Sequence, residues 1–301
     1  MNSDICWGID MGGTKIEGAV FRKSPKLEIL ARIRLNTEQE LGYQHILNQF
    51  IKLVNLLKEA SGLIPEKIGI GTPGTIDSVT KTIKNSNTQC IIGKPMKDDL
   101  ESLLKVKIIM ANDANCFAFA ETILGAVPEI IVNPEVVFGI IMGTGVGGGI
   151  VIDHKIINGL HGIAGEWGHN PLADTGDTCY CGKIACVETF ISGPATEKYY
   201  KSISGIALKT TDIYSKYLEG DQFAVMTINR LIQYFGKAVA QIINILDPDI
   251  IVIGGGLSHL DVLFTLGRNE VKKHLFNKEF NTKFIKPKLG DSAGVIGAGL
   301  L

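Results

Sequence analysis

Basic clusters, long apolar runs and aromatic residues are all scarce in this sequence of 301 residues. Lys and Arg number 30 against 31 Asp and Glu, so no block of positive charge is available to bind nucleic acid or an anionic membrane. The longest stretch without a charged residue, Val136 to Ile152, has 17 residues, and six of them are glycine. That stretch is too short and too rich in glycine for a membrane helix. We therefore expect neither nucleic acid nor a membrane as a partner.

Features of a secreted protein are also missing at the N-terminus. No basic segment precedes the first apolar stretch, and Asp4 and Asp10 interrupt it, so a signal peptide is not expected. The six cysteines are then expected to be thiols or metal ligands rather than disulfides. These observations predict a cytoplasmic protein.

Glycine, in contrast, is abundant. The 35 glycines in 301 residues are about 12%, against a usual ~7%. Apolar residues make up 45% of the chain, which excludes intrinsic disorder, and the length predicts two domains at roughly 150 residues each. The excess of glycine calls for an explanation beyond ordinary turns.

The chain shows a coarse internal repeat. Ile5 to Ile9 is a predicted strand, Asp10 to Lys15 a polar glycine turn, and Ile16 to Phe21 a second strand. The same order returns in residues 136 to 157, with its glycine turn at Gly143 to Gly149. Two related domains, each opening with a hairpin whose tip is glycine, would produce this pattern.

Strands alternate with helices elsewhere, which predicts an α/β protein. Tyr43 to Ser61 has helical apolar spacing and stops at Gly62, and a strand at Lys67 to Ile70 follows it. Residues 158 to 194 contain few periodic apolar positions and predict an irregular insert. The remaining predicted elements are a strand at Lys107 to Met110, helices at Asn112 to Leu124, Pro194 to Tyr217 and Asp221 to Leu246, a strand at Ile250 to Ile253 and a terminal helix at Ser292 to Leu301.

Three glycine clusters follow predicted strands, at Asp10 to Lys15, Gly143 to Gly149 and Gly254 to Gly256. Such clusters let backbone N–H groups approach a phosphate. A dinucleotide fingerprint is excluded because Gly143 to Gly148 is followed by a strand, and a second match, at Gly69 to Gly74, contains a proline. A single glycine turn is usually only a hairpin, but three together favour phosphate binding.

His169, Cys179, Cys181 and Cys186 fall within 18 residues and supply an imidazole and three thiols. This is the ligand set of a closed tetrahedral zinc site. The alternatives are three unrelated thiols, or a Cys179–Cys181 disulfide, which would be strained with one intervening residue. Four protein ligands leave no position for water, so the zinc is expected to be structural and to hold the insert.

Asp113 directly follows a predicted strand, where α/β proteins place their chemistry. A carboxylate there suits a general base, but the same residue suits an N-cap of the following helix. The residues alone leave both interpretations open.

The motifs as a set resemble the ROK family of bacterial sugar kinases, in order from residue 8 to about 300. Details of the cysteine segment and of the two glutamate motifs look closest to the fructokinase and mannokinase branch. The motifs that carry the resemblance are Gly8 to Lys15, Gly71-Thr72-Pro73-Gly74, Asn112-Asp113-Ala114-Asn115, Gly165-Glu166-Trp167-Gly168-His169, Cys179 to Glu188, and Asp247-Pro248 before Gly254.

The resemblance implies a two-domain actin-like ATPase fold, related to ribonuclease H, with a zinc-stabilised insert at residues 158–194. Its domains would be residues 1–115, with a terminal helix at about 290–301 packed back on them, and residues 116–289. ATP and Mg²⁺ are the implied cosubstrate and cation, in addition to the structural Zn²⁺.

Carried over residue by residue, the resemblance makes Asp113 the catalytic base and orients Asp10 toward Mg²⁺. The loops implied to hold ATP contain Asp10, Gly12, Gly13, Thr14, Lys15, Gly143, Thr144, Gly145, Gly254, Gly255 and Gly256. The residues implied to bind the sugar are Gly74, Asn112, Asp113, Glu166, His169 and Glu188. Ala185 stands where the family has glycine, so a positive φ there would be strained.

The expected activity is phosphorylation of a hexose by ATP, with fructose O6 as the first choice and mannose as a possible second substrate. N-acetylglucosamine, N-acetylmannosamine and glucose are the alternatives, because kinases for all of them share these motifs. A sugar-sensing regulator is less expected, since such proteins carry a DNA-binding domain ahead of the first glycine motif and seven residues precede Gly8 here. A homodimer is also implied.

Overall fold

The computed structural model describes residues 4–301, which form two compact units. Unit 1 contains the chain up to Val132 together with Gly149–Ala164 and Lys288–Leu301. Unit 2 contains Asn133–Gly148 and Gly165–Pro287. In this division the first crossover lies after Val132 rather than after residue 115, and residues 1–3 of the first predicted domain lie outside the described residues.

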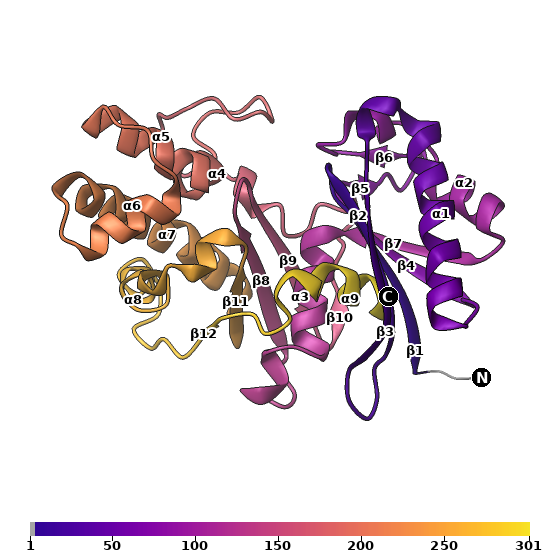
Figure 1. Ribbon diagram of the computed structural model, residues 1–301. Helices are drawn as coiled ribbons and strands as arrows, with labels where there is room; N and C mark the ends of the chain where they lie inside the picture. Colours follow the sequence, from indigo (N-terminus) through magenta and orange to yellow (C-terminus); the bar gives the residue numbers. More distant parts are fainter. Residues whose placement is uncertain (1–3) are drawn as a thin grey trace. The chain divides into compact units, whose positions relative to one another are not determined.

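Unit 1 is built on a five-stranded sheet of order β3-β2-β1-β4-β7 (Figure 1). Strands β1, β2 and β3 are antiparallel, whereas β1, β4 and β7 run parallel. The elements assigned wholly to this unit are β1 (Ile5–Met11), β2 (Lys15–Arg22), β3 (Glu28–Asn36), α1 (Tyr43–Ser61), β4 (Lys67–Thr72), β5 (Thr75–Ile76), β6 (Ile83–Lys84), α2 (Met96–Leu104), β7 (Lys107–Asn112), α3 (Asp113–Ile123), β10 (Lys155–Ile156) and α9 (Ala293–Leu300).

Helix α1 begins and ends at the predicted residues, Tyr43 and Ser61. Its apolar stripe is fully buried against the sheet and includes Phe50 and Leu57. Gly62 ends the helix in the left-handed conformation, with φ of 70°. Local periodicity and one glycine were therefore enough to predict this helix.

Helix α9, yellow in Figure 1, contacts β1, β4 and α3 although it ends the chain. Glycines allow the backbones to meet: a Cβ on Gly8 would lie 2.0 Å from the carbonyl oxygen of Val295, and one on Gly69 would lie 1.7 Å from that of Ala298. Part of the excess of glycine therefore serves close packing between helix and sheet rather than phosphate binding.

Unit 2 is built around β8 and β11, with helices beside them (Figure 1). The second sheet has the order β10-β9-β8-β11-β12, with β8, β11 and β12 parallel and β9 and β10 antiparallel. The elements assigned to this unit are β8 (Val136–Met142), α4 (Glu188–Ile191), α5 (Gly193–Ser204), α6 (Thr210–Leu218), α7 (Gln222–Leu246), β11 (Ile250–Gly254), α8 (Leu266–Lys272) and β12 (Lys283–Ile285), and the division between the units falls within β9 (Val146–Ile152).

The two sheets have corresponding strand orders, with β8, β9, β10, β11 and β12 in the places of β1, β2, β3, β4 and β7. This agrees with the internal repeat seen in the sequence. Two local predictions were wrong. The second glycine turn is shorter than predicted, because Gly147 to Gly149 belong to β9. The helix predicted at 194–217 is two helices, since Gly205 ends α5 with φ of 75°.

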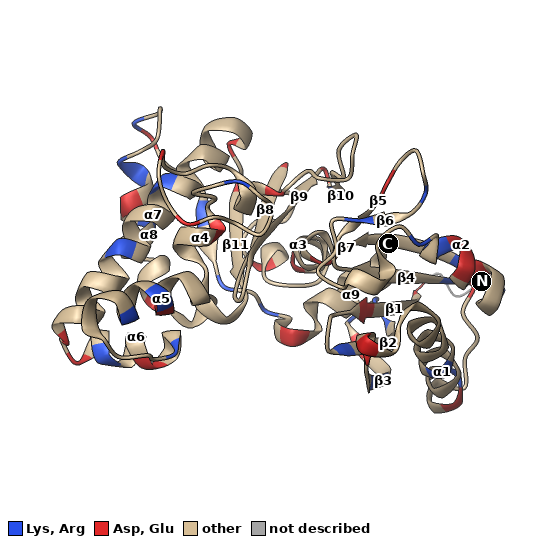
Figure 2. Ribbon diagram, turned by 90° about the horizontal axis from the view of Figure 1, so that it is seen from above, with Lys and Arg blue, Asp and Glu red and all other residues tan. Residues whose placement is uncertain are grey.

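Residues of both charge signs occur side by side on the same helices in each unit (Figure 2). This distribution matches the near-zero net charge of the chain. Among residues 4–301, no helix combines the length and the apolar character needed to cross a membrane.

Candidate functional site

In unit 1 the first glycine turn joins β1 to β2 and is held by its own backbone. The N–H of Gly12 donates to the carbonyl of Lys15 at 2.8 Å, and the hydroxyl of Thr37 donates to the carbonyl of Gly12 at 2.7 Å. The N–H of Thr37 donates to the carbonyl of Thr14 at 3.0 Å. Thr14 and Lys15 are exposed. The predicted phosphate loop is therefore a fixed hairpin tip.

Asp10 precedes this turn by one residue, and its carboxylate lies against two glycines. A Cβ on Gly71 would lie 3.3 Å from Oδ1 of Asp10, and one on Gly294 would lie 2.5 Å from Oδ2. The pKa of Asp10 is raised to about 7, chiefly by burial; the charges of Asp113 and Glu17 also raise it, and the charge of Lys15 opposes the shift. The carboxylate thus occupies a place where its charge is costly.

Asn112 and Asp113 lie where β7 meets α3. The N-cap is Asn112, whose Oδ1 accepts from the N–H of Ala114 at 2.9 Å. Its Nδ2 donates to the carbonyl of Gly74 at 3.3 Å. Asp113 is the first helical residue and is exposed, with Oδ1 also 2.8 Å from the N–H of Ala114. Asn112 therefore takes the capping role that the sequence left open for Asp113.

In unit 2 three backbone segments meet at the ends of β8 and β11. The N–H of Gly143 donates to the carbonyl of Gly145 at 2.9 Å, and that of Gly193 donates to the carbonyl of Gly143 at 2.8 Å. Gly255 has φ of 80°, and a Cβ there would lie 2.3 Å from the carbonyl of Met142. The turn containing Thr144 and the loop Gly254–Gly256 are thus neighbours, as phosphate and adenosine loops would need to be.

Glu188 begins α4 and lies against the second glycine turn. Its Oε2 accepts from the N–H of Val146 at 2.9 Å, and a Cβ on Gly145 would lie 2.7 Å from the same oxygen. Glu166 is partly buried, which raises its pKa; the charge of His169 opposes this shift and that of Glu188 adds to it. The charges of Glu188 and His169 therefore both act on the carboxylate of Glu166.

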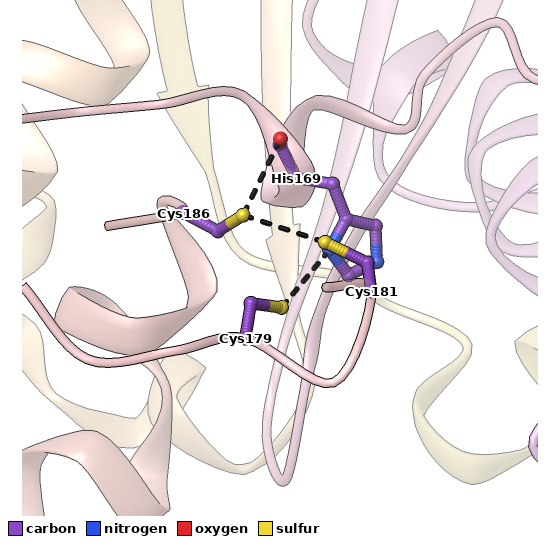
Figure 3. Close-up of side chains that lie close together, drawn as sticks. All are labelled: His169, Cys179, Cys181 and Cys186. Atoms are coloured by element: carbon purple, nitrogen blue, oxygen red, sulfur yellow. Dashed lines mark hydrogen bonds between the residues drawn. The ribbon is translucent and has the colours of Figure 1, made fainter. Parts of the chain in front are cut away.

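The four predicted metal ligands come together in unit 2 (Figure 3). Their ligand atoms all lie within 4.8 Å of one another. Sγ of Cys179 is 3.5 Å from Nδ1 of His169, and Sγ of Cys181 is 3.6 Å from Sγ of Cys186. A tetrahedron with Zn–S of ~2.3 Å and Zn–N of ~2.0 Å has edges of about 3.8 and 3.5 Å. The donor set and its spacing therefore fit zinc.

Two further features of this cluster concern its geometry. Ala185, directly before the last cysteine, has φ of 56° and is fully buried, so it adopts a left-handed conformation that is strained for alanine and that glycine would adopt without strain. Tyr180 was missed by the sequence analysis: its side chain is exposed, and its hydroxyl is 3.0 Å from Nε2 of His169. The two nitrogens of His169 thus face different partners, Nδ1 the cysteines and Nε2 this phenol.

The predicted residues gather into one group in each unit. In unit 1 they are the glycine turn, Asp10 and the start of α3; in unit 2 they are the second glycine turn, the loop Gly254–Gly256, the two glutamates and the cysteine cluster. Gly294 was not singled out as a site residue, because only the packing of α9 brings it to Asp10.

Known proteins match this chain over nearly its whole length. N-acetyl-D-glucosamine kinase of Vibrio atlanticus (strain LGP32) is 35% identical over 305 residues, which covers 98% of both chains. A ROK hexokinase from Thermus thermophilus superposes with a TM-score of 0.86 at 28% identity, over 98% of this chain and 97% of that one. A ROK family glucokinase from Streptomyces griseus, in complex with glucose and AMPPNP, gives a TM-score of 0.79 at 26% identity, with 98% of each chain covered. The ROK family matches residues 6–301, and the chain therefore belongs to the ROK family.

Proposed function

We propose that this protein is a kinase that transfers the γ-phosphoryl group of ATP to N-acetyl-D-glucosamine. The observation that carries the proposal is the likeness to the Vibrio kinase, 35% identical over 98% of both chains. This likeness favours N-acetylglucosamine, one of the alternatives given by the sequence, over fructose, which was the first choice. The glucokinase bound to glucose and AMPPNP supports the more general assignment of a sugar and a nucleotide.

The proposed chemistry places most of the work in positioning, because phosphoryl transfer needs little covalent participation from the protein. Asp113 accepts the proton of the attacking hydroxyl, which we assign to O6 of the sugar. Its exposure at the start of α3, where Asn112 is the cap, is consistent with that role. Mg²⁺ bound with ATP would neutralise phosphate charge, and in this proposal Asp10 would be the acidic residue that orients it.

The glycine turns of the two units supply backbone N–H groups to the phosphates in this proposal. The carbonyls of Gly12, Thr14 and Gly143 are already engaged within the protein, which fixes both turns in place. Glu166 and Glu188 accept hydrogen bonds from sugar hydroxyls, a task that suits carboxylates because each can accept from two O–H groups.

We further infer that the four-residue cluster holds one structural Zn²⁺. Four protein ligands close the coordination shell, so the metal orders the segment between Glu166 and Glu188 and takes no part in the transfer. In this arrangement His169 acts on the sugar through its place in the shell, and Tyr180 fixes the orientation of its ring. A homodimer and a cytoplasmic location stay predictions from the sequence.

A panel of sugars tests the proposal. ADP release is measured with MgATP and N-acetylglucosamine, N-acetylmannosamine, glucose, mannose or fructose, and we expect the highest kcat/KM for N-acetylglucosamine. A higher kcat/KM for fructose would restore the fructokinase interpretation. Release no greater than in the ATP-only control for every sugar would contradict the kinase assignment.

A further inference from the structure

A pocket of about 200 Å³ lies within unit 1, beside the start of α3. Its wall comes from three segments: β5 with the start of β6, the end of β7, and residues 158–162. The apolar part of the wall consists of Ile76, Ile83, Met110, Ala111 and Leu160. None of these five residues belongs to the predicted site.

The pocket adjoins the residues assigned to the sugar. Gly74 lines it, and the carbonyl of Gly74 accepts from Nδ2 of Asn112. Ala111 also lines it and directly precedes Asn112 in β7. A sugar whose attacking hydroxyl reaches Asp113 would therefore have part of its ring next to this pocket.

The wall combines an apolar surface with a few polar groups. Thr75, Ser78 and Asn158 supply two hydroxyls and an amide. Oδ1 of Asn158 accepts from Nδ2 of Asn115 at 3.4 Å, and Asn115 is only 2% exposed, so the orientation of Asn158 is set from inside the unit. Among the described residues, Oδ1 of Asn115 is itself buried without a partner.

The segment 158–162 is closely packed on β5. Gly162 has φ of 68°, and a Cβ on it would lie 2.2 Å from Oγ1 of Thr75. A side chain at this position would push the two walls apart. The width of the pocket is therefore determined by the absence of a side chain at Gly162.

We propose, building on the kinase function above, that this pocket binds the acyl group of a 2-acylamino sugar and so determines the preference for such sugars over plain hexoses. An acyl group needs apolar surface for its methyl end and hydrogen-bonding groups for its amide, and the wall offers both. A hexose hydroxyl would leave the apolar wall without a partner.

The volume makes the proposal specific. An acetyl group has three non-hydrogen atoms and takes up about 90 Å³ if each needs the ~30 Å³ of a water molecule. A pocket of about 200 Å³ has room for a longer chain. We therefore expect N-propanoylglucosamine to be phosphorylated about as well as N-acetylglucosamine.

The test compares Ile76→Phe with Ile64→Phe. Ile76 lines the pocket, whereas Ile64 is 82% exposed, belongs to the same unit and has no part in the pocket, so the control makes the same chemical change elsewhere. kcat/KM is measured for N-acetylglucosamine, N-propanoylglucosamine and glucose. Where turnover of glucose is too slow to follow, its inhibition constant against N-acetylglucosamine replaces kcat/KM.

We expect Ile76→Phe to lower the ratio of kcat/KM for N-acetylglucosamine to kcat/KM for glucose about tenfold or more, because the larger side chain fills the pocket. The loss in kcat/KM should be greater still for N-propanoylglucosamine. Ile64→Phe should leave the ratio at the wild-type value. An unchanged ratio for Ile76→Phe, or a parallel loss for all three sugars at an unchanged melting temperature, would overturn the pocket assignment.

If the melting temperature of Ile76→Phe is below that of the wild type, Leu160→Phe serves as the test variant instead. Leu160 is 81% exposed, so a larger side chain there does not disturb the packing of the core. The same ratio and the same two outcomes apply to it. Wild-type protein that phosphorylates another sugar but not N-acetylglucosamine contradicts the proposed function itself. If the wild-type protein phosphorylates N-acetylglucosamine but neither variant changes the ratio of kcat/KM values, only the pocket assignment is contradicted.

Discussion

Asp10 should make the ligand-free protein less stable as the pH rises, and Asp10→Asn should remove that effect. The carboxylate is wedged between Gly71 and Gly294, and burial is the largest cause of its high pKa. The folded protein therefore binds this proton more tightly than the unfolded chain does. The pKa of Asp10 is 3.8 in the unfolded chain and about 7 in the folded protein. Between these two pH values only the folded protein holds the proton, so the free energy of unfolding falls as the pH rises.

The size of the effect follows from the shift in pKa. A shift of about three units at 1.36 kcal/mol per unit gives roughly 4 kcal/mol, which is an upper bound because solvent reaches part of the side chain. Above pH 7 the wild-type protein should carry this full cost. Asparagine has nearly the same shape and no charge, so Asp10→Asn should be more stable than wild type at pH 8 and similar to it at pH 4.

Urea denaturation of both proteins without Mg²⁺ or nucleotide, from pH 4 to pH 8, measures the difference. All other titrating groups are common to the two proteins, so the difference between their curves isolates Asp10. Asp98→Asn is a matched control, since Asp98 is exposed on α2 and should change stability by less than about 1 kcal/mol at any pH. Parallel curves for wild type and Asp10→Asn, or a less stable variant at pH 8, would refute the reasoning.

Three further substitutions test the proposed site. Asp113→Asn should lower kcat by about 10² to 10⁴-fold with little change in sugar affinity by calorimetry, and a variant keeping more than about half of wild-type turnover would show that Asp113 is not the base. Elemental analysis should find about one zinc per wild-type chain and none in Cys181→Ser, with a higher sugar KM and unchanged helical circular dichroism; full activity of metal-free wild type would contradict this. Gly145→Ala should cost up to about 10²-fold in kcat/KM, because its Cβ would lie 2.7 Å from Oε2 of Glu188 and displace the turn or that carboxylate; wild-type kcat/KM would show that the turn adapts.

Elements with a strong local pattern were predictable, and those without one were missed. Helix α1 has an apolar stripe and a terminal Gly62, both readable without the fold. Strand β3, Glu28–Asn36, was missed because its residues are mostly exposed or half-buried and include several charges, so no apolar run marks it. Helix α2, Met96–Leu104, was missed because two buried apolar residues over nine positions give too weak a period.

The same distinction holds for the site. The approach of His169 and the three cysteines was predictable because all four fall within 18 residues, so their spacing alone restricts the geometry. The role of Asn112 as the cap was not, because either of two adjacent polar residues can cap a helix and only the backbone conformation decides between them. The short second turn was mispredicted because glycines within a strand look like glycines within a loop.

The sequence by itself determined the α/β class, the repeated hairpins, the glycine turns and the cluster of one histidine and three cysteines, since each depends on residues near one another in the chain. Tertiary structure alone decided three features that join distant segments. Gly294 from the last helix lies against the carboxylate of Asp10, and Gly8 meets the backbone of that helix. Gly162 closes on Thr75 and shapes the pocket that we assign to an acyl group. Contacts of this kind depend on how β-strands and helices pack, and periodicity along one segment carries no information about which distant backbone it will meet.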